Sequence, residues 1–133
     1  MRREWARLSA VMAEKTVKIP GPDHPITVGK NPDRVVVKAG DRVIADTRDA
    51  LSLQEANYPA VQYIPRKDVD LTQLERTDHQ TYCPYKGDAS YYTILPDGVN
   101  AVWTYEQPYD AVADIREHVA FYPDKVTIEI TAD

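Results

Sequence analysis

The stretch RVVVKAGDRVIADT, residues 34–47, gives the clearest indication of how this chain folds. Its apolar residues alternate, so Val35 and Val37 share one face of an extended strand and their neighbours face the other way. The sequence AGD at residues 39–41 is typical of a tight turn. The stretch therefore predicts two antiparallel strands, at residues 34–38 and 42–47, joined as a hairpin.

Outward from this hairpin, short segments rich in β-branched and aromatic residues recur toward the C-terminus. We predict further strands at residues 50–56, 61–64, 89–95, 99–105 and 125–131, with an irregular segment at residues 67–75. In the last strand, Val126, Ile128 and Ile130 are expected to face inward. Many short strands at close spacing predict a mainly β, single-domain antiparallel fold, built as two sheets or as a barrel.

One α-helix is expected in the C-terminal half of the chain. Pro108 stands near its predicted start and Pro123 lies beyond its end, because proline is tolerated in the first turn of a helix but not in its interior. Val112, Ile115 and Val119 lie at helical spacing and would form one apolar stripe. The fold class is therefore mainly β with a single helix.

Chain length predicts one domain. A chain of 133 residues can bury a core of its own, and we place that domain at residues 26–133. Residues 1–25 are expected to be an N-terminal extension and a Pro-rich linker. Within the extension, Trp5, Leu8 and Met12 have roughly helical spacing and predict a short amphipathic segment.

Composition and charge limit the expected partners. The formal net charge is -5, and no window has the excess of Lys and Arg that a phosphate backbone requires, so nucleic acid is not expected. A single cysteine cannot close an intramolecular disulfide, which favours a reducing cytoplasm. No apolar run resembles a signal peptide or a membrane span. We expect a cytoplasmic monomer or homodimer that binds a small molecule and needs no cofactor.

Reactive side chains are concentrated in TDHQTYCPYKGDASYY, residues 77–92, which hold the only cysteine and four of nine tyrosines. Cys83, Lys86, His79 and Asp88 are the candidate catalytic residues, because a nearby cation favours the nucleophilic thiolate. The turn sequence at residues 84–87 favours Lys86 over His79 as the neighbour of the thiol. Alternatively, Cys83 is a small buried apolar residue, and Lys86 and Asp88 form a surface ion pair.

Aromatic residues offer a second way to bind a ligand. Tyr82, Tyr85, Tyr92 and Trp103 are candidate ligand-binding residues, because the flat faces of two or three rings can hold a planar or cationic molecule. Arg66, in the preceding loop, could hold an anion. The alternative is that these rings serve only core and cross-strand packing.

Several strings, in this order, resemble a small bacterial family known as domain of unknown function 427. They are ADTR at 45–48, YIPR at 63–66, DH at 78–79, YCPYKG at 82–87, ASYY at 89–92, AVW at 101–103 and VAFYP at 119–123. The resemblance covers about residues 26–131. It implies a compact, mostly β domain, akin to the two-sheet β-tent folds that include methionine sulfoxide reductases and small-ligand aromatic cages.

The resemblance implies no established activity. Members of the family are also labelled nucleotidyltransferase-like, a chemistry that uses a Gly-Ser turn ahead of two metal-binding acids. Asp68 and Asp70 have the spacing of such acids, but no Gly-Ser precedes them. The β-tent folds often carry two cysteine pairs around zinc, and this chain has one cysteine. No metal is therefore expected.

We expect a small-molecule pocket around His79–Tyr92, and three readings of its function stay open. In the first, the pocket belongs to an enzyme that performs a thiol-dependent or acid-base step. In the second, it belongs to a non-catalytic module that holds a ligand between aromatic rings. In the third, the motif serves only folding, or binding of a partner protein.

Overall fold

The computed structural model describes residues 15–132, in which ten β-strands and three short 3-10 turns are found. The strands are β1 (Ile26–Asn31), β2 (Arg34–Ala39), β3 (Arg42–Thr47), β4 (Ala50–Glu55), β5 (Val61–Pro65), β6 (Leu74–Cys83), β7 (Gly87–Ile94), β8 (Gly98–Thr104), β9 (His118–Phe121) and β10 (Thr127–Thr131). The turns are η1 (Arg66–Asp68), η2 (Leu71–Gln73) and η3 (Asp110–Ile115). Among these residues no helix is long and apolar enough to cross a membrane. The helical segment predicted at residues 2–12 lies outside the described residues.

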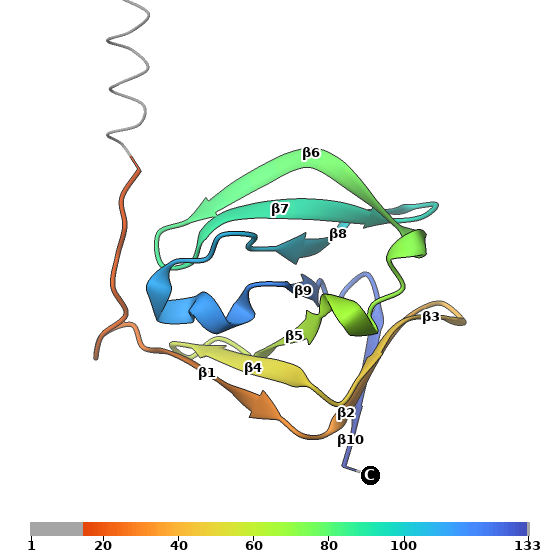
Figure 1. The fold of residues 1–133 in the computed structure, drawn as a ribbon, viewed down its shortest axis with the longest axis horizontal. Coiled ribbons are helices and arrows are strands. Elements are labelled where there is room, and N and C mark those ends of the chain that lie inside the picture. The colour runs from red at the N-terminus through yellow and green to blue at the C-terminus, as the bar shows by residue number, and fades with distance from the viewer. Residues whose placement is uncertain (1–14, 133) are drawn as a thin grey trace, which may run out of the picture.

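Seven strands form one antiparallel sheet in the order β1-β4-β5-β9-β8-β7-β6, which Figure 1 shows from bottom to top. The pairing of β5 with β9 is short and consists of Ile64 with Val119 and Pro65 with His118. By contrast, β6 and β7 form a long hairpin with a register shift between Arg76 and Gln80. The described strands leave β1 and β6 as free edges, so the predicted two-sheet arrangement is confirmed and the barrel is not formed.

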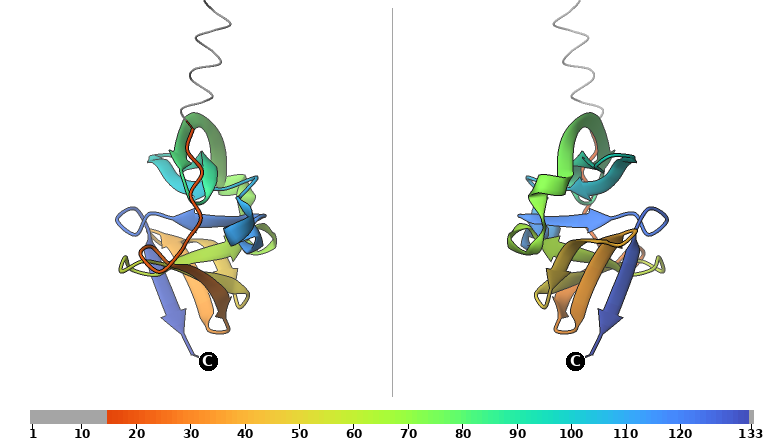
Figure 2. Two further views of the ribbon diagram at one scale, coloured as in Figure 1. Left: turned by 90° about the vertical axis from the view of Figure 1, so that its left-hand side faces the viewer. Right: turned by 90° about the vertical axis from the view of Figure 1, so that its right-hand side faces the viewer.

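The smaller sheet contains three strands in the order β10-β2-β3. Its β2–β3 pair is the hairpin predicted from residues 34–47. Gly40 closes that hairpin with a φ of 60°, a conformation that a residue without Cβ adopts at little cost. Figure 2 shows β10 lying beside this hairpin, at the end of the molecule where the chain finishes.

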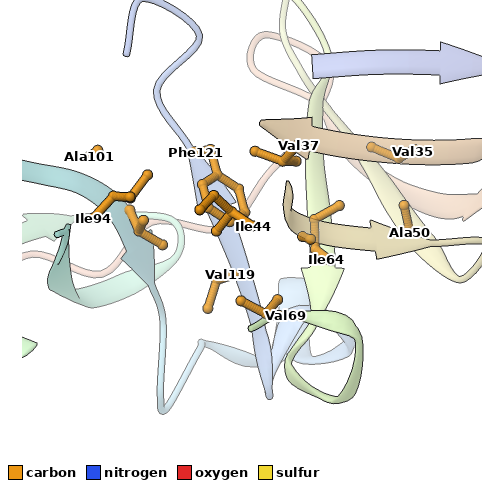
Figure 3. Close-up of a cluster of buried hydrophobic side chains, with 12 residues drawn as sticks. Val35, Val37, Ile44, Ala50, Ile64, Val69, Ile94, Ala101, Val119 and Phe121 are labelled. Carbon is orange, nitrogen blue, oxygen red and sulfur yellow. The ribbon is translucent and has the colours of Figure 1, made fainter. Parts of the chain in front are cut away.

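The main core lies between the two sheets. Val35 and Val37 face inward from β2, as predicted, and join Ile44 of β3 in one cluster with Ile64 and Val119 of the larger sheet. Figure 3 shows these side chains converging from both sheets. Complete burial of an aliphatic side chain contributes roughly 1.5–3 kcal/mol, so this cluster joins the two sheets firmly.

A second apolar cluster occupies the opposite face of the seven-stranded sheet. There, Val112 and Ile115 of η3 are buried in the same cluster as Tyr63 of β5. Adjacent residues of a strand point to opposite faces, and β7 shows this directly: Tyr91 belongs to the second cluster, whereas Tyr92 packs against the main core. The sheet therefore has one face for the smaller sheet and one face for the candidate site.

The α-helix predicted after Pro108 is wrong. The chain forms only the η3 turn, and Glu117 follows it with a φ of 64°. Val119, which the spacing placed on a helical stripe, is buried in strand β9. A 3-10 turn repeats every three residues and an α-helix every 3.6, so the spacing of Val112 and Ile115 fits both.

Three other segments differ from the prediction. Strand β1 begins where the Pro-rich linker was expected to end, and it was not predicted as a strand. Strand β6 was also not predicted, and it contains residues 77–83. Ile130 was expected to face inward but is 47% exposed, because it lies near the end of an edge strand.

Candidate functional site

A pocket of about 290 Å³ opens on the face of the seven-stranded sheet that carries the second cluster. Six aromatic side chains make up most of its lining, and Glu55 and Lys86 are its charged groups. The aromatic residues are Tyr58, Tyr63, Tyr91, Trp103, Tyr105 and Tyr122. Pockets that are mostly apolar with a few placed polar groups are the usual form of small-molecule site.

Strand alternation and register bring these rings together. Tyr91 of β7 lies opposite Trp103 of β8, and Trp103 lies opposite Ala120 of β9. Tyr63 reaches the same face from β5. Tyr122 follows β9 directly, and its backbone N–H donates to the Ala101 carbonyl at 3.0 Å. Three of the six rings, those of Tyr63, Tyr91 and Trp103, therefore come from strands of the sheet. The other three lie in the segments that connect strands.

Contacts between the rings fix their positions. The Trp103 indole N–H donates to the Tyr63 hydroxyl at 3.2 Å, and the two rings meet edge to face. On its other side, Trp103 lies 4.5 Å from the Tyr122 ring, centroid to centroid. The Tyr91 hydroxyl bonds to Thr81 at 2.8 Å and to the Tyr122 hydroxyl at 3.4 Å. The aromatic walls are thus preorganised by hydrogen bonds at their polar tips.

Burial disfavours ionisation of three phenols of the pocket, those of Tyr63, Tyr105 and Tyr122. It raises the pKa of Tyr63 and of Tyr105 above the ordinary tyrosine value. For Tyr122, burial together with the Tyr91 hydroxyl raises the pKa to about 12. Within residues 15–132 the Tyr105 hydroxyl has no hydrogen-bond partner, although the residue is buried and lines the pocket. It is therefore available to a ligand as a donor or an acceptor.

A buried ion pair forms the polar end of the pocket. The Lys86 ammonium donates to Glu55 Oε1, and the second carboxylate oxygen lies 2.8 Å from His24 Nε2. Burial raises the pKa of Glu55, but the hydrogen bonds from Lys86 and His24 outweigh it and hold the pKa below its usual value. The His24 ring in turn stacks on Tyr85 at 4.2 Å, with the two planes nearly parallel. Glu55 is therefore an ionised and firmly oriented acceptor.

Residues 15–25 hold His24 against the sheet. Figure 1 shows this segment running along one side of the molecule, from the β6–β7 end to β1. Its backbone N–H at Lys18 donates to the Pro84 carbonyl at 2.9 Å, and the Tyr82 hydroxyl donates to the Thr16 carbonyl at 2.6 Å. The segment predicted as a linker thus supplies one member of the polar network.

The four candidate catalytic residues do not converge. The Lys86 side chain reaches Glu55 and the pocket, whereas Asp88 is exposed and pairs with Lys15 at 3.1 Å. His79 is exposed on β6 and meets the Tyr91 ring from outside the pocket, at 4.5 Å. Cys83 is half-buried, packs against the second cluster and is not among the residues that line the pocket.

The candidate ligand-binding residues are also divided. Trp103 lines the pocket. Tyr85 does not line it but stacks on His24, which bonds to Glu55 of the lining. Tyr82 bonds to the Tyr109 hydroxyl at 2.9 Å, away from the pocket. Tyr92 faces the opposite side of the sheet, where Arg66 donates to its hydroxyl at 3.2 Å. The cavity has an aromatic lining, but most of its rings are tyrosines other than the predicted ligand-binding residues.

Sequence reasoning missed several residues of the site. Glu55 and His24 carry no local signal, because their partners lie 31 residues away in both cases. Tyr63 could have been found, since the alternation of residues 61–64 puts it on one face with Val61, which also lines the pocket. Tyr122 lies in one of the family-like strings and could have been chosen on that ground.

The acids with nucleotidyltransferase spacing serve turns in this structure. Asp68 accepts from the Thr47 hydroxyl at 2.7 Å, and Asp70 accepts from the backbone N–H of Thr72 at 3.2 Å. Across residues 15–132, no three His, Cys, Asp or Glu side chains lie close enough together to hold a metal ion.

The fold and the pocket together define an antiparallel two-sheet β protein with a preformed aromatic cavity in its larger sheet. The chain belongs to the family described as Domain of unknown function (DUF427), whose model matches residues 27–132. This confirms the resemblance, and the matched region contains β2 to β10 and all of β1 except Ile26. A search of curated proteins found no match.

Proposed function

We propose that this protein is a non-catalytic module that binds a small planar molecule in the aromatic pocket. The observation that carries the proposal is the convergence of five tyrosines and Trp103 on one cavity of about 290 Å³. Tyr63, Tyr91 and Tyr105 are buried, so these walls are in place before a ligand arrives. Preorganised aromatic faces favour flat ligands, because ring stacking then costs little conformational entropy.

The polar end of the pocket favours a neutral ligand. The Lys86 ammonium offers donors and the Glu55 carboxylate offers acceptors, and their charges cancel. A charged ligand would leave one buried charge unbalanced, which is costly. A single-ring molecule with an acceptor and a donor at one edge, such as an aromatic amide or phenol, would satisfy both groups. The Tyr105 hydroxyl supplies a third hydrogen bond.

The geometry gives less support to a thiol-dependent enzyme. The Lys86 side chain pairs with Glu55 and not with the thiol, and Cys83 does not line the pocket. His79 and Asp88, the other members of that predicted site, lie on the outside. We propose a cytoplasmic location for the module, because Cys83 is a free thiol and suits a reducing compartment.

Tryptophan fluorescence tests the proposal directly. In a Trp5→Phe background, Trp103 is the one tryptophan left, and it lines the pocket. We expect its emission to change on titration with at least one of a panel of single-ring amides, phenols and alcohols, beginning with 4-hydroxybenzamide. Tyr122→Ala should weaken that binding by about tenfold, because it removes one aromatic wall.

Tyr109→Ala is the matched control. Tyr109 is half-buried and bonds to another tyrosine hydroxyl, as Tyr122 does, but it lies outside the pocket. It should leave binding unchanged. The proposal fails if no compound in the panel alters Trp103 emission, or if the two substitutions weaken binding equally. If the substitutions lower the stability of the protein and no compound of the panel binds, the result would instead support the hypothesis that residues 77–92 serve only folding.

A further inference from the structure

We infer that Lys86 is a carbonyl-capture site, whose side-chain nitrogen forms an iminium bond with small aromatic aldehydes bound in the pocket. The inference rests on the proposed function, because the aldehyde must first occupy the aromatic cavity. It adds a covalent step and names a class of ligand, the single-ring aldehydes, that a non-covalent pocket would not distinguish from other flat molecules.

The position of Lys86 is the first observation that supports this inference. Among residues 15–132 it is the one buried lysine, with a side chain 9% exposed, whereas the side chains of Lys15 and Lys67 are 55% and 63% exposed. Its amine lies at the wall of a cavity that solvent and small molecules can enter. Lysines that form Schiff bases are typically desolvated in apolar pockets in this way.

The arrangement of Glu55 is the second observation. Both of its oxygens are engaged, one by Lys86 and one by His24, so the carboxylate is held against the amine. The lowered pKa of Glu55 makes it a weak base, but its carboxylate is in direct contact with the amine and is the group that can transiently accept the proton that the ammonium must lose before it attacks a carbonyl. It can afterwards balance the positive charge of the iminium. A lysine beside bulk water would have neither a fixed base nor a fixed counter-ion.

The step balances within the pocket. Glu55 takes one proton from the Lys86 ammonium, and the free nitrogen lone pair attacks the aldehyde carbon. A C–N bond forms, the carbonyl electrons pass to oxygen, and a proton moves from nitrogen to that oxygen to give a carbinolamine. Glu55 returns its proton to the hydroxyl, which leaves as water while the C=N bond forms. The ammonium and the aldehyde thus become an iminium and one water molecule, with no change in net charge.

The walls of the pocket favour the product. An iminium conjugated to an aromatic ring is a flat cation, and Tyr63, Trp103 and Tyr105 line the cavity in which it would form. Aromatic faces attract cations, most strongly where water is excluded. These features favour aldehydes of one ring, which the cavity can enclose.

Reductive trapping tests the inference on the full chain. The protein is incubated with 4-hydroxybenzaldehyde and sodium cyanoborohydride, and the modified lysine is identified by intact mass and peptide mapping. We expect one adduct, at Lys86, formed at least about tenfold faster than at any exposed lysine. Glu55→Gln removes the proton acceptor and also the anion that favours the ammonium. The inference requires the first effect to be the larger, so labelling of Lys86 should slow by about tenfold, and unchanged or faster labelling would overturn the role of Glu55. Lys67→Arg is the control and should change nothing.

The outcomes separate this inference from the proposed function. 4-Hydroxybenzyl alcohol has the same ring but no carbonyl, and Trp103 fluorescence reports whether it binds. If the alcohol binds while Lys86 is labelled no faster than surface lysines, covalent capture is overturned and the binding module stands. If neither compound occupies the pocket, covalent capture is overturned, and the proposed function fails as well when no other compound of the panel alters Trp103 emission. If Lys86→Arg still gives a single fast adduct, the reactive amine is another lysine.

Discussion

The ion pair between Lys86 and Glu55 contributes both to the stability of the fold and to the candidate site. A buried ion pair contributes to stability only when hydrogen bonds replace the lost water, and here the Glu55 carboxylate has a partner on each oxygen. Removing either partner would leave a charge only partly compensated. The pair is therefore expected to stabilise the fold under conditions that keep Glu55 ionised.

The pH dependence of stability tests this expectation. The folded-state pKa of Glu55 lies below its ordinary value of 4.5, so its contribution is fully present above pH 4.5 and is lost as pH falls through the lowered value. Glu55→Gln should reduce the free energy of unfolding at pH 7 by about 1–3 kcal/mol and flatten the decline below pH 4.5. Urea unfolding at a series of pH values measures both effects.

Glu106→Gln is the control for this experiment. Glu106 also has a lowered pKa, because Arg76 donates to it, but its side chain is 48% exposed. An exposed pair contributes under ~1 kcal/mol, so this substitution should have a smaller effect at pH 7. An equal effect of the two substitutions would mean that the Lys86–Glu55 pair behaves as a surface pair.

At the scale of elements, the β6–β7 hairpin positions Lys86. The backbone N–H of Lys86 donates to the Cys83 carbonyl at 3.2 Å, which closes the turn and directs the side chain toward Glu55. Gly87 then starts β7 with a φ of 111°, which side-chain-bearing residues rarely adopt. The motif that contains the only cysteine is therefore organised by its turn and not by the thiol.

Substitution of Gly87 tests the importance of this turn. A Cβ at Gly87 would lie 3.3 Å from the backbone oxygen of Gln107 and would strain the backbone as well. Gly87→Ala should therefore lower the free energy of unfolding by about 2–4 kcal/mol. Gly40→Ala, with a φ of 60° and nothing within 4 Å, should cost only about 1 kcal/mol. Guanidinium unfolding measures both, and equal losses would contradict the argument from crowding.

Much of the element pattern could be predicted because it is local. Alternating apolar residues and a Gly-containing turn predict the 34–47 hairpin. The hairpin is present, and the prediction that Val35 and Val37 share one face was confirmed. The wrongly predicted helix at residues 108–119 shows where local prediction fails. The spacing of apolar residues is the same for an α-helix and for a 3-10 turn followed by a strand. The non-helical backbone of Val112 and Arg116 and the positive φ of Glu117, which no local pattern signals, separate the two.

At the scale of the whole molecule, the site depends on topology. Clustering in sequence selected Tyr82, Tyr85 and Tyr92, but alternation sends Tyr91 and Tyr92 to opposite faces of the sheet. The rings of the pocket are spread from Tyr58 to Tyr122 and meet only because β5, β9, β8 and β7 are neighbours in the sheet. That order is non-sequential, so it could not be read from segments one at a time. Of the residues predicted for the site, only Lys86 and Trp103 line this cavity.

The shared core makes the two sheets one cooperative unit. Ile44 lies in the smaller sheet and is fully buried in a cluster with side chains of the larger sheet, whereas its neighbour Val43 is 46% exposed. Ile44→Ala should lower the free energy of unfolding by about 2–5 kcal/mol through the lost contacts and the cavity. Val43→Ala should cost under about 1 kcal/mol.

Two spectroscopic probes show whether the loss of stability caused by Ile44→Ala affects both sheets. In the Trp5→Phe background, fluorescence follows Trp103 in the larger sheet, while circular dichroism follows the strands of both. Because Ile44 packs against Ile64 and Val119, its truncation should shift both transitions together to a lower denaturant concentration. A separate, earlier transition in circular dichroism alone would mean that the smaller sheet unfolds by itself. The pocket would then be carried by the seven-stranded sheet without help from the β2–β3 hairpin.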